Sequence, residues 1–150
     1  MENKYYTPSI EELYVGFECE AYSTLTPKTN YNPVIVDTFL LQDICDHINE
    51  DYFEPSHYRV KYLNSEDIKS LGFKFTSLDA TGVICWYVKR ATFKILNWTF
   101  HEVLINHNPE NNMIWIFAME NGEATQLFQG IVKNKSELVK VISMTVVTVK

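Results

Sequence analysis

Glu18 and Glu20 are the two residues of this chain whose types and spacing best suit acid–base chemistry. They alternate with Val15, Phe17 and Cys19, a period-2 pattern that predicts a half-buried strand. Carboxylates two residues apart on a strand share one face and lie about 7 Å apart, which suits a paired acid and base or a hard cation. Because that face adds no third acidic group and no nucleophile, we favour a solvated strand face, and we expect no catalytic residues.

The histidines and cysteines do not form a metal or nucleophile motif. No histidine pair has helical metal-binding spacing with a partnering glutamate, and Cys45 and His47, two residues apart on a predicted helix, point in different directions. Cys45 falls in an apolar stripe, so we expect it to be buried. The three cysteines are odd in number and widely spaced, so they indicate neither a disulfide framework nor a zinc ribbon. We therefore expect no metal and no cofactor.

Aromatic strands that also carry lysines are the remaining candidates for ligand binding. Trp86 with Lys61, Lys74 or Lys89 offers a ring for stacking and a cation for a phosphate, as nucleotide-binding surfaces do. Such rings more often belong to a core. Glu18, Glu20 and these four residues are the weak ligand-binding candidates of the sequence.

Composition limits the class of protein. The chain has 150 residues, 46% hydrophobic content and a net charge of -6, which fit one soluble globular domain and disfavour broad binding to nucleic acid. It contains no apolar run of the ~20 residues that a membrane span needs and no secretory signal pattern. We therefore expect a cytoplasmic protein that does not bind membranes.

The order of the elements predicts an α+β fold. A lead-in at residues 1–12 precedes the strand that carries Glu18, and a long loop is expected at 23–33. Asp37 is placed to cap a helix at about 38–50 that carries Phe39 in its apolar stripe. The other expected elements are strands at 58–63, 73–76, 83–88, 91–98, 99–106, 113–119 and 125–132, helices at about 65–71 and 135–143, and a final strand or ordered tail at 144–150.

These segments imply a twisted antiparallel meander of about five to seven strands, with two or three helices packed on one face. The turn Asn121-Gly122 is the strongest hairpin signal, because both central residues of a type I′ turn need positive φ. We expect a single globular domain over residues 1–150.

One short sequence motif occurs twice, at residues 62–72 and 132–142. Each copy predicts a strand that ends on a helix N-cap, Asn64 in the first and Asn134 in the second. Asp67 and Glu137, three residues after each asparagine, are placed to bond back to the cap, so their side chains serve structure rather than catalysis.

Three blocks of sequence stand out: YTPSIEE and VGFE within residues 6–18, RVKYLNSEDIKSLGF at 59–73 and FQGIVKNKSEL at 128–138. In that order they resemble a family of small phage and prophage proteins of anaerobic gut-type bacteria that has no assigned activity. The resemblance implies viral origin. It assigns no role to any residue.

We therefore expect a non-enzymatic phage-encoded interaction protein that binds a host or phage protein and inhibits or redirects a host factor, such as a component of anti-phage defence. Two alternatives stay open at this stage. One is a binding protein that sequesters a small ligand or a nucleotide, and the other is a minor structural component of the virion.

Overall fold

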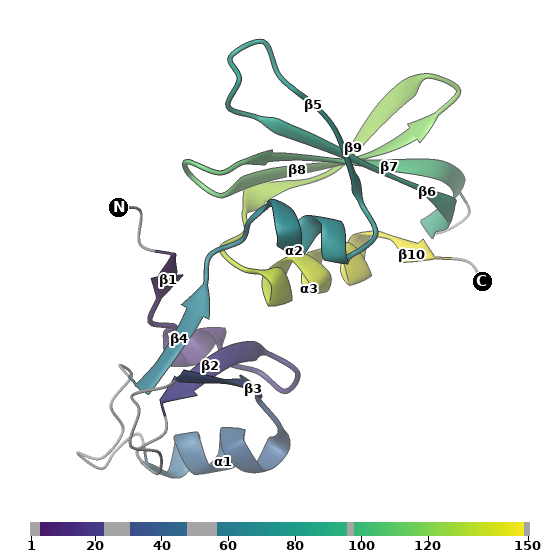
Figure 1. Ribbon diagram of the computed structural model, residues 1–150. Helices are drawn as coiled ribbons and strands as arrows, with labels where there is room; N and C mark the ends of the chain where they lie inside the picture. The colour runs from purple at the N-terminus through teal and green to yellow at the C-terminus, as the bar shows by residue number, and fades with distance from the viewer. Residues whose placement is uncertain (1–3, 23–30, 48–56, 96–97, 149–150) are drawn as a thin grey trace. The chain divides into compact units, whose positions relative to one another are not determined.

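The described residues of the chain form two antiparallel sheets and three α-helices, which Figure 1 labels. The computed structural model describes residues 4–22, 31–47, 57–95 and 98–148. Backbone contacts divide the chain into two compact units, Met1–Tyr62 and Leu63–Lys150, and each unit has its own hydrophobic core. The predicted α+β class is confirmed, but the sequence predicts only one of the two sheets. The expectation of a single globular domain stays a prediction.

The first unit is a four-stranded sheet in the order β1-β4-β2-β3. Helix α1 contributes Ile44 to a core that also holds Phe17 and, from the inner face of the sheet, Cys19 and Val60. The elements of this unit are β1 (Tyr5–Tyr6), the 3₁₀ helix η1 (Ile10–Glu12), β2 (Glu18–Tyr22), β3 (Tyr31–Ile35), α1 (Thr38–His47) and β4 (Tyr58–Lys61).

Local backbone geometry corrects the expected start of the strand that carries Glu18. Gly16 has a φ of 95°, a left-handed conformation that glycine adopts easily, so the chain turns there and the strand begins only at Glu18. Val15 is consequently exposed instead of lying on the apolar face. Residues 31–33 of the expected loop belong to β3, and residues 23–30 lie outside the described residues.

Helix α1 begins where the sequence predicts it. The Leu40 backbone N–H donates to Asp37 Oδ1 at 2.7 Å, which is the expected cap. Two predictions for this helix are wrong: Phe39 is 85% exposed, and Cys45 is exposed rather than buried. Both side chains lie outside the narrower stripe that packs on the core, which α1 forms with Leu40, Leu41 and Ile44. Residues 48–50 of the expected helix lie outside the described residues.

The second unit is a six-stranded antiparallel sheet. Five of its strands follow the order β10-β6-β7-β8-β9, and β5 pairs with another part of the long strand β6. The elements are α2 (Ser65–Ser70), β5 (Lys74–Leu78), β6 (Cys85–Ile95), β7 (Trp98–Asn108), β8 (Met113–Glu120), β9 (Glu123–Ile131), α3 (Lys135–Thr145) and β10 (Val147–Thr148).

The predicted meander is confirmed, with one correction. The strands expected at 83–88 and 91–98 are one strand, β6, whose pairing with β7 shifts between Arg90 and Phe93. Asn121 and Gly122 both have positive φ, 51° and 85°, as the expected hairpin turn requires.

Both helices of the second unit pack on the same face of its sheet. Ile68 of α2 and Leu138 of α3 join one core cluster with Tyr87, Ile105 and Ile116 from the central strands. Because side chains alternate along a strand, the residues between these three point to the opposite, outer face. The expectation that helices cover one face of the meander is therefore confirmed.

The two copies of the repeated sequence motif lie side by side. The Leu63 backbone N–H donates to the Lys133 carbonyl at 2.7 Å, which joins the residues immediately before the two caps. Asn64 Oδ1 accepts from the Asp67 N–H at 3.1 Å, and Asp67 Oδ2 accepts from the Asn64 N–H at 3.1 Å, so the first cap is a complete capping box.

The second cap differs in one bond. Asn134 Oδ1 accepts from the Glu137 N–H at 2.9 Å, but Glu137 Oε2 accepts from the Lys133 N–H at 2.6 Å, one residue before the expected donor. Asn134 is only 2% exposed, whereas Asn64 is half-buried. Loss of the Asn134 side chain therefore leaves the Glu137 N–H without its acceptor at a place that water reaches less easily than the first cap.

We expect Asn134→Ala to lower the free energy of unfolding by about 2 kcal/mol and Asn64→Ala by about 1 kcal/mol. Urea denaturation followed by far-UV circular dichroism measures both values. Asn134→Ser, which keeps a capping oxygen, is the control and is expected to recover most of the loss. Equal losses in the two alanine variants would contradict the role of burial.

His107 makes the stability of the second unit depend on pH. Burial lowers the pKa of this histidine from its usual 6.5 to about 4. Since the unfolded chain then binds a proton at a higher pH than the folded chain, the free energy of unfolding is expected to fall as the pH drops from about 6.5 towards 4, by up to about 3 kcal/mol. Comparing the wild type with His107→Gln across this range isolates the effect, and parallel pH profiles would refute it.

Candidate functional site

Most of the polar and aromatic side chains of the first sheet point to its outer face, away from the core. Residues directly opposite one another in neighbouring strands point to the same face, and the pairs are Tyr5 with Lys61, Glu20 with Arg59, Tyr22 with Tyr31, Glu20 with Pro33, and Glu18 with Ile35. We call these nine residues the outer face of the first sheet. Three of the predicted candidates, Glu18, Glu20 and Lys61, therefore come together here.

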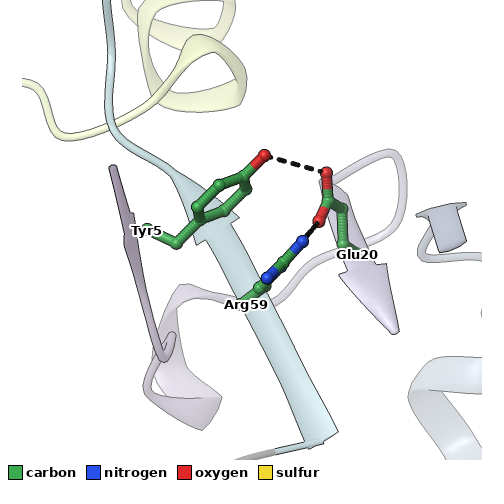
Figure 2. A network of polar contacts seen from close by, with 3 residues as sticks. All are labelled: Tyr5, Glu20 and Arg59. Atoms are coloured by element: carbon green, nitrogen blue, oxygen red, sulfur yellow. Dashed lines mark hydrogen bonds and ion pairs between the residues drawn. The ribbon is translucent and has the colours of Figure 1, made fainter. Parts of the chain in front are cut away.

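Arg59 is the centre of this face. Its Nε donates to Glu20 Oε2 at 2.7 Å, its Nη2 lies 2.6 Å from the same oxygen, and the Tyr5 hydroxyl donates to Glu20 Oε1 at 3.4 Å (Figure 2). The guanidinium carbon lies 4.1 Å from the centroid of the Tyr5 ring and 3.8 Å from that of the Tyr31 ring. Arg59 is thus held by one carboxylate and two aromatic rings at once.

Further rings extend this cluster along the same face. The Tyr22 ring meets the Tyr31 ring edge to face, with centroids 5.6 Å apart, and lies stacked against the His57 ring at 6.0 Å. Edge-to-face and stacked rings fix one another's orientation. The strands β1, β2, β3 and β4 therefore present a preorganised surface of tyrosines around one arginine.

These contacts involve groups that the sequence offers for acid–base chemistry. The Arg59 guanidinium pairs with Glu20, so one carboxylate of the Glu18–Glu20 pair is already engaged by a cation. Burial and the neighbouring Glu20 charge raise the pKa of the Cys19 thiol to about 11, so this cysteine stays protonated at neutral pH. Among the described residues, no three histidine, cysteine or carboxylate side chains are placed to share a metal ion.

The other predicted candidates lie in the second unit and are divided between two faces. Lys74 is opposite Val88 and Trp86 is opposite Asn106, so both belong to the outer face of the second sheet, away from α2 and α3. Lys89 has a different place. Its Nζ donates to the Leu71 carbonyl at 2.9 Å and lies 5.6 Å from the centroid of the Phe73 ring, where it closes the C-terminal end of α2.

Sequence reasoning missed several residues that complete the outer faces of the two sheets. Tyr5, Tyr31 and Arg59 come from three strands whose pairing no local pattern reveals. For the same reason the sequence does not single out Asn106 and Trp115, which lie opposite each other in the second sheet. The available signal was alternation within a strand, which separates the two faces only after the strands are paired.

Comparison with family models, with curated proteins and with solved structures finds no match to this chain. The resemblance to a phage family stays a prediction. In the part of the chain that the structure describes, no helix has the length and apolar character required to cross a bilayer.

We expect Arg59→Lys to lower the free energy of unfolding by about 1 kcal/mol, because lysine cannot stack flat between two rings while pairing with a carboxylate. Near-UV circular dichroism of the tyrosines should weaken at the same time. Arg90→Lys is the matched control, since Arg90 pairs with Glu102 at 2.7 Å on an exposed part of the second sheet, and it should change neither measurement. Similar effects of both substitutions would exclude a special role for the stacked rings.

Proposed function

We propose that this chain is a non-enzymatic, phage-encoded interaction protein that binds a host protein through the outer face of the first sheet and thereby inhibits or redirects it. A component of anti-phage defence in the host cytoplasm is the partner class that we favour. The observation that carries the proposal is Arg59 stacked between Tyr5 and Tyr31 on a partly exposed sheet face. Tyrosine and arginine dominate the energetic centres of protein interfaces.

An exposed apolar border at one end of this face supports a protein partner. Ile35, which belongs to this face, is 65% exposed, and Val15 is exposed as well. The Gly16 N–H donates to the Val36 carbonyl at 2.7 Å and the Val36 N–H donates to the Phe17 carbonyl at 2.9 Å, which brings the segment of Val15 beside the end of β3. Apolar side chains next to a Tyr–Arg centre give the composition of an interface core.

Charge also favours a protein over a nucleic acid. The outer face of the first sheet carries two carboxylates, Glu18 and Glu20, and two cations, Arg59 and Lys61, so it has no excess positive charge. One of the cations is already paired with Glu20. A phosphate backbone needs several unpaired cations, whereas a nearly neutral face with ordered rings suits a protein surface.

The test is capture of a host protein by the whole chain and by a variant with an altered surface. We expect the immobilised wild type to retain a stoichiometric protein from host lysate and Ile35→Asp to lose it, because a charge replaces an exposed apolar side chain of the proposed face. Met144→Asp is the matched control: Met144 is also largely exposed, but it lies on α3 of the second unit, and this variant should bind like the wild type.

Circular dichroism of the wild type and the two variants checks that all three proteins are equally folded. Absence of any stoichiometric partner, or retention of the same partner by Ile35→Asp, would refute the proposed docking surface.

A further inference from the structure

A row of two tryptophans and one asparagine crosses the outer face of the second sheet. Trp86 of β6 is directly opposite Asn106 of β7, which is directly opposite Trp115 of β8. Neighbouring strands are about 4.8 Å apart, so the backbones of the two tryptophans are separated by about 10 Å. The asparagine side chain is smaller than the indole on either side of it, and we call this row of three residues the notch.

The notch contains hydrogen-bonding groups that nothing in the described structure satisfies. Asn106 is only 8% exposed, and its Oδ1 has no hydrogen-bond partner among the described residues. The Nε1 donor of Trp86, the residue opposite, also has none. A buried indole N–H normally finds an acceptor, and a buried carbonyl normally finds a donor. One acceptor and one donor therefore stand unpaired on adjacent residues.

The surroundings of the notch add an apolar wall and a cation. The next row on the same face is Val88, Leu104 and Phe117, all half-buried. Lys74 of β5 is opposite Val88 and exposed, and its ammonium has no hydrogen bond or ion pair among the described residues. A ligand at this place meets ring faces, one donor, one acceptor and one positive charge.

We propose that this notch binds a mononucleotide. The edge of a nucleobase carries an adjacent donor and acceptor that match Asn106 Oδ1 and Trp86 Nε1, and the flat ring stacks on an indole. The phosphate pairs with Lys74. The two polar atoms become accessible when a half-buried indole turns outward, so binding changes the environment of a tryptophan.

A single nucleotide fits better than a strand of nucleic acid. The outer face of the second sheet also carries Glu102, which pairs with Arg90 and removes that cation from phosphate binding. The chain as a whole has a net charge of -6. A polymer needs a row of free cations along its backbone, and Lys74 supplies one. This site is independent of the docking surface proposed for the first unit.

Tryptophan fluorescence and calorimetry test the proposal on the whole chain. In a Trp98→Phe background, only Trp86 and Trp115 contribute tryptophan emission. We expect titration with AMP, GMP, CMP or UMP to change this emission and to release heat for at least one of them, while ribose 5-phosphate, which has no base, gives neither signal. No response to any of the four up to millimolar concentration overturns the proposal, as does binding of an oligonucleotide alone.

Three substitutions assign the binding to the notch. Trp115→Leu should raise the Kd at least about tenfold through loss of stacking. Lys74→Ala should raise it several-fold, whereas Lys94→Ala, another exposed lysine of the same sheet, should leave it unchanged. Asn106→Leu should abolish binding and raise the melting temperature, because it removes an unpaired buried carbonyl. Unchanged Kd values in Trp115→Leu and Lys74→Ala overturn the proposal even where Asn106→Leu does not fold.

Discussion

Cross-strand register is the constraint on which both units depend. Alternate side chains of a strand point to opposite faces of the sheet. A shift of the pairing by one residue would therefore exchange the side chains of the core with those of the solvent-facing surface. In the first sheet, the pairing of Glu20 with Arg59 places Cys19 and Val60 in the core. In the second, the pairing of Tyr87 with Ile105 places Trp86 and Asn106 on the outer face. The same pairs therefore decide where the core lies and what the surface presents.

The caps add the second level of order, because they determine which face of the second sheet is covered. Leu63 and Val132 are buried core residues, and each is followed within two residues by a capping asparagine that turns the chain into a helix. The bond from the Leu63 N–H to the Lys133 carbonyl joins the two junctions. Both helices thus start side by side and contribute Ile68 and Leu138 to the same core, which puts both helices of this unit on one face of its sheet.

Local features of the fold were predictable from sequence, and features that depend on distant pairing were not. The caps at Asn64 and Asn134 and the turn at Asn121-Gly122 follow from short-range hydrogen bonds and backbone preferences, which a few neighbouring residues determine. The cluster of Tyr5, Tyr31 and Arg59 joins segments up to 54 residues apart, since 59 − 5 = 54. Phe39 shows a different limit: helical periodicity indicates an apolar stripe, but the width of the stripe that packs depends on the sheet beneath it.

The two outer faces also differ in how their polar groups are satisfied, and this difference bears on what each can bind. On the first sheet, Arg59 is paired with Glu20 and stacked by rings before any partner arrives, so little side-chain freedom is left to lose on binding. On the second sheet, Asn106 and Trp86 each have a buried group without a partner among the described residues, which costs about 1–3 kcal/mol per group in the free protein. A ligand that pairs both groups recovers that free energy as affinity. A preordered surface of tyrosines thus favours a large partner with many weak contacts, whereas an unsatisfied notch favours a small ligand with one matching edge.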